Sequence, residues 1–170
     1  MIGRPEPSEA AHHYSTYINL VSSDNILGAI ETQFEETLSF LAGISEEQSL
    51  HRYAEEKWTM RELLSHVNDT ERVFLFRALW FGRGFQDPLP SFDQNIGVEG
   101  AGANQVSWAR HLEEFRSIRL ATIYFFRNLP PEGWMRSGIA SDSLVTVRAL
   151  AYIIAGHVAH HTAVLRERYL

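Results

Sequence analysis

Three histidines close to the end of the chain are spaced so that two of them could bind one metal ion. The segment 156–170, GHVAHHTAVLRERYL, contains His157, His160 and His161. The apolar positions of the preceding segment VRALAYII continue through 157 and 161 at the spacing of one helix face. His157 and His161 therefore lie one turn apart in line with the buried stripe, where two imidazoles can hold the same ion.

A third histidine, His66, lies at a matching depth on a second predicted helix. It follows Thr59, at the start of that helix, by seven residues, and His161 precedes Arg168 by seven residues. Each interval corresponds to roughly 10 Å of helix. If the two helices are antiparallel, His66, His157 and His161 converge near one end of the protein. Three nitrogen ligands with a fourth position open to water or substrate describe a catalytic metal site better than a structural one.

Spacing alone leaves other interpretations of these histidines open. A single histidine in an apolar stripe is more often a hydrogen-bonded core residue than a ligand. His160 lies about 60° around the helix from His157. It could therefore replace His161 as a ligand, although we expect it to point to a flank. The other four histidines, for which we expect surface or linker positions, are His12, His13, His51 and His111.

Two carboxylates that follow His66 are candidates for supporting roles. Asp69 lies one turn further along the same helix and could orient the His66 imidazole through its second nitrogen. Asp69 and Glu71 are also the candidate general bases if the site hydrolyses its substrate. For both residues, and for Arg72, we favour the simpler interpretation of a solvated or salt-bridged helix face.

Four long amphipathic segments predict the helices that would position these groups. They cover about residues 24–42, 59–82 and 107–128, and the region from about 146 to the C-terminus. No alternating segment predicts a strand, so we expect an all-α four-helix bundle. The connection 84–104 is long enough to carry the chain back along the bundle. This crossover between the second and third helices predicts up-down-down-up order, in which the second and last helices are antiparallel.

Capping residues predict where the helices begin. Ser23 or Asp24 is expected to cap the first long helix, and Ser143 or Thr146 to start the last. The segment TMRE at residues 59–62 is a capping box, in which threonine and glutamate bind each other's backbone N–H groups.

Length and composition limit the class of protein. We expect residues 1–170 to form a single domain with an N-terminal extension, 1–22, whose first eight residues are frayed and which then forms a short helix. A net charge of −6 without a basic run argues against nucleic acid and anionic membranes as partners. The chain has no long apolar run, no signal peptide and no cysteine, so we expect a cytoplasmic protein without disulfides or Cys-ligated zinc.

Two segments resemble the signature motifs of the DinB-like (YfiT-type) superfamily. In WTMRELLSHVNDTERVFLFRAL a tryptophan opens the helix, a histidine follows eight positions later, and a DTER segment comes next. AGHVAHHTAVLRERY resembles the histidine motif of the superfamily's last helix. The resemblance runs from about residue 14 to the C-terminus. It implies an up-down-down-up four-helix bundle, frequently dimeric, in which His66, His157 and His161 hold a divalent metal ion.

The resemblance and the histidines lead to three functional hypotheses. The first is a metal-dependent transferase that uses a low-molecular-weight thiol of the bacillithiol or mycothiol type, held by the metal as a thiolate. The second is a metal-dependent hydrolase, in which the metal lowers the pKa of a bound water. The third is a non-catalytic metal-binding or stress-associated scaffold whose aromatic residues, Trp80 and Phe81 among them, form an interface.

The expected cofactors and partners follow from these hypotheses. Three imidazoles suit zinc, nickel or iron almost equally, so the ligand types leave the identity of the metal open. The thiol would be a second, diffusible cofactor. The expected partners are a small-molecule substrate and a second copy of the chain in a homodimer, with no nucleic acid and no membrane.

Overall fold

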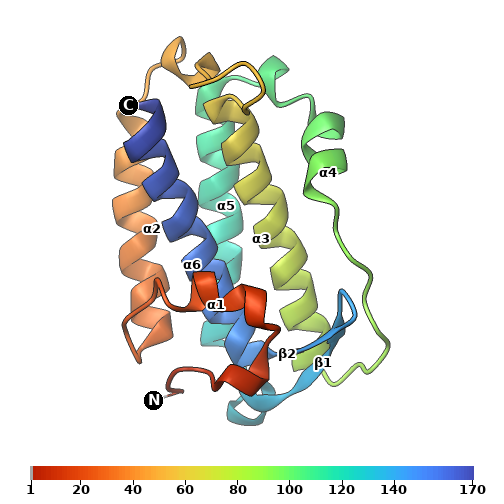
Figure 1. Cartoon of the computed structure of the whole chain (residues 1–170). Coiled ribbons are helices and arrows are strands. Elements are labelled where there is room, and N and C mark those ends of the chain that lie inside the picture. Colours follow the sequence, from red (N-terminus) through yellow and green to blue (C-terminus); the bar gives the residue numbers. More distant parts are fainter. Residues whose placement is uncertain (1) are drawn as a thin grey trace.

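Four long helices that pack along one another form the body of the protein in this computed structural model, which describes residues 2–170 (Figure 1). They are α2 (Ile26–Ala42), α3 (Met60–Gly82), α5 (Trp108–Arg127) and α6 (Val147–Val164), and a π-helical turn, Leu165–Tyr169, extends the last. Helices α2 and α6 run in one direction, and α3 and α5 run in the other. The predicted four-helix bundle with up-down-down-up order is therefore confirmed.

The crossover between α3 and α5 contains one element that we did not predict. A short helix, α4 (Gln94–Ala101), lies beside the first half of α3, in the segment that returns along the bundle to the start of α5 (Figure 1). The Asp93 carboxylate caps it by accepting from the backbone N–H groups of Asn95 and Ile96, and Gly102 ends it in the left-handed region at φ 57°. These eight residues have little periodicity, so the sequence did not predict the helix, which its caps stabilise at both ends.

A small hairpin also contradicts the expectation that the chain has no strand. Strands β1 (Ser137–Ala140) and β2 (Ser143–Thr146) pair antiparallel, with Ser137 opposite Thr146. The two turn residues, Ser141 and Asp142, both have positive φ, at 51° and 59°. This is the twist that two-residue hairpins favour, normally supplied by Asn-Gly or Asp-Gly. Because Ser-Asp is not such a signal, the hairpin was missed.

The observed helix starts agree with two of the three predicted caps. The Thr59 N–H donates to Glu62 Oε2 at 2.7 Å and the Glu62 N–H to Thr59 Oγ1 at 3.1 Å, which confirms the capping box. Thr146, rather than Ser143, caps α6 by accepting from the Ala149 N–H. The cap of α2 is Asn25, one position beyond the predicted Asp24.

The N-terminal segment lies on the outside of the bundle and is bound to it. The expected short helix is α1 (Ser15–Ile18), which lies across α6 (Figure 1). Residues 2–8, for which we expected fraying, lead into the buried Glu9, which accepts from Thr146 Oγ1 at 2.7 Å and from Arg148 Nε at 3.1 Å. Met1 lies outside the described residues. The sequence did not predict this contact, because residues as far apart as Glu9 and Arg148 leave no periodic pattern when they pair.

Helix α6 occupies the centre of the protein. Every residue from 149 to 158 is buried, because α1, α2 and α3 all pack against this helix. A side chain carried there is removed from water whether it is apolar or polar. Within residues 2–170, no helix is both long and apolar enough for a membrane span.

We predict that Gly156→Ala destabilises the protein. A β-carbon at Gly156 would overlap the backbone carbonyl of Tyr17, so α1 must move away from α6. We expect a loss of about 1–3 kcal/mol in the free energy of unfolding, the usual cost of overpacking. The matched control is Gly100→Ala in α4, where the new methyl group meets no atom within 4 Å. There alanine should be neutral or stabilising by up to about 1 kcal/mol. Urea unfolding of the two variants measures the difference, and equal stabilities would contradict the close packing at Gly156.

Candidate metal centre

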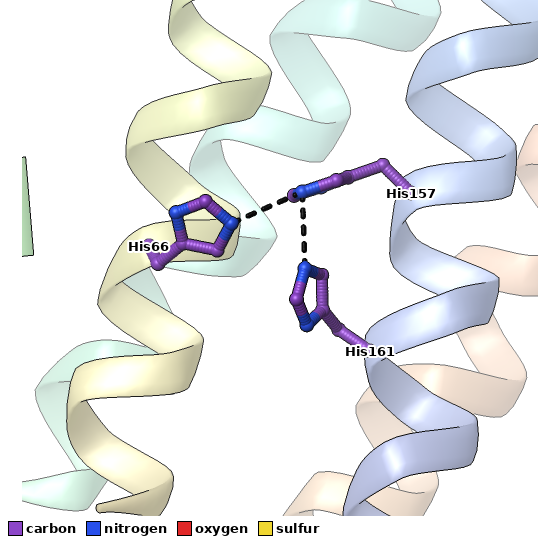
Figure 2. A group of neighbouring side chains, drawn as sticks. All are labelled: His66, His157 and His161. Carbon is purple, nitrogen blue, oxygen red and sulfur yellow. Dashed lines mark hydrogen bonds between the residues drawn. The ribbon is translucent and has the colours of Figure 1, made fainter. Parts of the chain in front are cut away.

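Three imidazoles meet between α3 and α6. Figure 2 shows His66 reaching from α3 towards His157 and His161, which lie one turn apart on α6. The Nε2 atom of His157 lies 3.1 Å from His66 Nε2 and 3.1 Å from His161 Nε2. The possible ligand atoms of all three residues lie within 4.8 Å of one another. The predicted convergence of the three histidines is therefore observed, and it follows from the antiparallel arrangement of the two helices.

The chemistry of these nitrogens fits a metal ion. His66 and His157 are only 4% and 3% exposed. Burial, which disfavours the charged form, lowers the pKa of His66 to about 4 and that of His161 to about 3. Burial also holds the pKa of His157 well below its usual range, reinforced by the neighbouring His161 and His66. All three imidazoles are therefore neutral at pH 7, so each has a lone pair free for a metal.

The spacing of the nitrogens also fits. Zinc binds imidazole nitrogen at about 2.0–2.1 Å, and tetrahedral geometry then places two such nitrogens about 3.3 Å apart. Two of the three separations, both 3.1 Å, are close to this value, and the third, between His66 and His161, lies within 4.8 Å. The cluster includes His161 and leaves out His160, whose ring lies beside Tyr17 at 5.6 Å between centroids. Of the two candidates for the third nitrogen, His161 is thus the one that joins His66 and His157.

The residue that orients His66 differs from the one we considered. The Nδ1 atom of His66 lies 3.3 Å from Thr70 Oγ1, so its N–H can donate to that hydroxyl and leave Nε2 free for a ligand. Asp69 instead pairs with Arg72 at 3.0 Å on the outer surface. Thr70 follows His66 by four residues and so shares its face, a signal that the sequence contained. His161 Nδ1 is buried and has no hydrogen-bond partner among residues 2–170.

A cavity of about 190 Å³ opens beside the cluster. Its lining includes His66 and His157 at one end, with aromatic side chains from α1, α3 and the crossover segment. The aromatic lining residues are Tyr14, Tyr17, Phe74 and Phe92. Among the described residues that line it, none is an aspartate or a glutamate. The cavity can therefore admit a small molecule next to the His66 and His157 imidazoles, but its described lining offers no carboxylate base.

Glu71, the other candidate base, belongs to a buried ion pair on a different face of α3. Its Oε2 lies 2.9 Å from Arg119 Nη2, and its Oε1 accepts from Thr122 Oγ1 at 2.7 Å. Glu71 is 2% exposed and Arg119 is fully buried, so the expected salt bridge exists but does not face solvent. Because both partners of Glu71 lie on α5, this carboxylate does not serve the histidine cluster.

The four histidines for which we expected surface or linker positions lie partly at the surface and partly in the core. His12, His13 and His51 are exposed as expected, although His13 also lines the cavity. His111 is buried, with Nε2 2.9 Å from the Ala103 carbonyl oxygen, so the surface position expected for it is wrong. It lies on the inner side of α5, where the crossover segment covers it.

The two aromatic residues named for an interface lie in different surroundings. Phe81 is fully buried and belongs to the core. Trp80 is half-buried and stacks on Phe85 with ring centroids 4.3 Å apart. Phe76 and Phe85 beside it are about half exposed, at 49% and 50%. Of the two residues, only Trp80, together with these neighbours, could contribute to an intermolecular surface.

The lowered histidine pKa values predict how the stability of the metal-free protein depends on pH. Unfolded, these groups titrate near 6.5; folded, His66 titrates near 4 and His161 near 3. Between those values the unfolded chain binds more protons, so the free energy of unfolding falls as pH decreases from about 6.5 to about 4. The slope is at most about 1.4 kcal/mol per pH unit for each histidine. Urea unfolding between pH 7.5 and 4.5 measures it. A variant with glutamine at all three positions should give a flatter curve, and equal slopes would contradict the prediction.

The fold and the cluster together define a class of protein: up-down-down-up helical bundles with a histidine cluster between two antiparallel helices. The sequence profile of the DinB superfamily matches residues 29–165, which include all three histidines. The chain therefore belongs to the DinB superfamily. A sequence comparison with curated proteins gave no significant match.

Solved structures show the same fold at low sequence identity. One is YfiT from Bacillus subtilis, described as a probable metal-dependent hydrolase with an unusual four-helix bundle topology. It is 15% identical, with a TM-score of 0.70 over 96% of this chain and 89% of YfiT. Another is the mycothiol-dependent maleylpyruvate isomerase, 12% identical, with a TM-score of 0.71 over 86% of this chain. The match spans only 61% of the isomerase, and at these identities the likeness concerns the fold alone.

Proposed function

We propose that His66, His157 and His161 hold a divalent metal ion and that the protein is a metal-dependent transferase acting with a low-molecular-weight thiol. The observation that carries this proposal is the cluster of three neutral imidazoles, two of which, the buried His66 and His157, line one end of a cavity. Three imidazoles leave a fourth coordination position for a ligand from the cavity. When bound, the ion would lower the pKa of a thiol, or in the alternative reaction of a water, in that position.

The surroundings of the cluster favour the thiol over the hydrolase alternative. Hydrolysis generally needs a base to take a proton from water. Asp69 is engaged by Arg72 on the surface, and Glu71 is paired with Arg119 between α3 and α5. The described cavity lining contains no carboxylate. Of the two structural neighbours, one is described as a probable metal-dependent hydrolase and the other as mycothiol-dependent, so the preference for the thiol rests on the missing base.

The roles of the chain's own residues follow from their positions. Thr70 orients the His66 imidazole so that Nε2 faces the other two nitrogens. Tyr17 packs at the edge of the His157 ring, with centroids 5.3 Å apart, and covers the cluster on the side of α1. The aromatic lining limits water around the bound thiol and its electrophilic substrate. We further propose that residues 1–170 act as one domain in the cytoplasm and assemble as a homodimer.

Cobalt-substituted protein provides the test of the thiol proposal. Addition of bacillithiol should produce the near-ultraviolet charge-transfer band of a thiolate bound to cobalt(II), and His157→Ala should abolish it. The same protein should then conjugate the thiol to 1-chloro-2,4-dinitrobenzene. If no band appears and the protein instead hydrolyses 4-nitrophenyl acetate in a metal-dependent reaction, the hydrolase alternative replaces the proposal. If neither activity occurs in metal-loaded protein, the scaffold hypothesis replaces both.

A further inference from the structure

Arg77 is a buried cation in the cavity that has no anionic partner among residues 2–170. It lies three turns beyond His66 on α3, on the same face as Thr70 and Phe74, and is 4% exposed. Its Nη2 donates to the Pro90 carbonyl oxygen and to Ser141 Oγ, both at 2.9 Å. The crossover segment and the hairpin turn thus hold the guanidinium in a fixed place.

In the described part of the chain, the other two buried arginines are each paired with a carboxylate, whereas Arg77 is not. Arg61 pairs with Glu46, and Arg119 pairs with Glu71. Among residues 2–170, no carboxylate oxygen lies within 4.0 Å of a nitrogen of Arg77, so Arg77 forms no ion pair there. A buried charge without a counter-ion is costly, and such groups commonly serve a ligand.

The guanidinium also has donors to spare. Arginine has five N–H donors, and two of them, both on Nη2, are used for Pro90 and Ser141. The three donors on Nε and Nη1 bind no described residue, and neither atom is among the fully buried polar atoms without a partner. These donors therefore remain accessible from the cavity.

The distance to the histidine cluster suits a small ligand. The Phe74 ring lies between the two ends of the cavity, 5.8 Å from Arg77 Cζ and 6.1 Å from the centroid of the His157 ring. The distance from Arg77 Cζ to the centroid of the His157 ring therefore cannot exceed the sum of these two distances. The cavity volume of about 190 Å³ is below the range of about 300–1,000 Å³ that holds drug-sized ligands. One molecule of a few carbon atoms could touch both ends.

We propose that Arg77 determines specificity by binding a carboxylate of the substrate, so that the protein acts on small organic acids. The electrophilic carbon of such an acid would then lie over Phe74, facing His66 and His157. A carboxylate is a planar acceptor, which matches the guanidinium better than a single point charge would. Because the chain carries a net charge of −6, this attraction must come from the local contact rather than from the overall field. The inference deepens the proposed function and rests on it for the reaction, but not for the binding.

The test compares crotonate with its neutral counterpart, crotonamide, on metal-free protein and again on zinc-loaded protein. Titration calorimetry should show that the wild type binds crotonate more tightly than crotonamide. Arg77→Met, which keeps the apolar stem, should weaken crotonate binding by about 10- to 100-fold and leave crotonamide unchanged. Equal crotonate affinities in the wild type and Arg77→Met would overturn the proposal, and so would failure of the wild type to bind crotonate.

A second variant, an NMR measurement and a second anion separate a loss of the Arg77 contact from a loss of folding. Arg77→Lys restores the charge without the planar fork and should recover part of the crotonate affinity. In wild-type protein labelled with ¹⁵N, crotonate should shift the Arg77 Nε resonance, a readout that does not require any variant to fold. Tighter binding of inorganic phosphate than of crotonate would overturn the choice of a carboxylate. Because the first arm contains no metal, loss of the metal or thiol activity would leave this result standing.

Discussion

His157→Ala is expected to weaken zinc binding by more than about 100-fold. His157 is the central member of the cluster, since its Nε2 lies 3.1 Å from the Nε2 atoms of both His66 and His161. Mutation of groups that merely orient a metal ligand costs about 10- to 100-fold in affinity, so loss of a ligand should cost more. Competition with a chromophoric chelator at pH 7.5 measures the affinity.

The control for this variant is the neighbouring histidine. His160 lies outside the cluster, so His160→Ala should bind zinc as the wild type does. Both variants should keep the helical circular-dichroism spectrum, because removal of one imidazole from the site leaves the packing of α3 against α6 in place. Equal zinc affinity in His157→Ala and the wild type would mean that the imidazoles are core residues and that the metal proposal is wrong.

Removing the charge of Glu71 is expected to cause the largest loss of stability. Arg119 is fully buried, and its nitrogens make no hydrogen bond with any of residues 2–170. Its positive charge is therefore balanced by the ion pair with the Glu71 carboxylate. Breaking a buried pair by changing one partner costs about 3–5 kcal/mol. For a chain of this length, Glu71→Gln should therefore lower Tm by roughly 6–20 °C, measured by calorimetry.

Two controls separate the buried pair from other effects of the substitution. Asp69→Asn removes a carboxylate two residues away whose pair with Arg72 is partly exposed. Its loss should cost less than about 1 kcal/mol. A double variant, Glu71→Gln with Arg119→Met, removes both charges and should recover much of the stability, since a buried cation no longer lacks a partner. If Glu71→Gln melts within a few degrees of Asp69→Asn, the ion pair does not hold α3 to α5.

The helices and the histidine cluster were predictable because they rest on local periodicity and chain topology. His157 and His161 follow from a spacing of four residues, and His66 follows from its depth together with the long crossover. The hairpin was not predictable, because its strands have four residues each and its turn, Ser141–Asp142, lacks a glycine. Short pairings of this kind depend on what surrounds them; here β1 packs against α3 and β2 against α6.

The charged groups inside the protein escaped prediction for a different reason. Glu71 was expected on a solvated or salt-bridged helix face, whereas Arg119 falls between the apolar positions of the third helix; both residues, and Arg77, are less than 5% exposed. Their partners lie on other elements, so the pattern of α3 or α5 alone does not show which groups pair. The same applies to His111, which was expected at the surface and lies under the crossover. Tertiary packing, rather than local propensity, decides the positions of such groups.

The coordination of a bound zinc ion provides the test of the three-histidine site. X-ray absorption at the zinc edge should be recorded on untagged protein loaded with one equivalent of zinc. We predict three imidazole nitrogens at about 2.0–2.1 Å and one further light atom, together with about one ion retained per chain after dialysis. A first shell without imidazole, or protein that retains no ion after addition of either zinc or nickel, would contradict it.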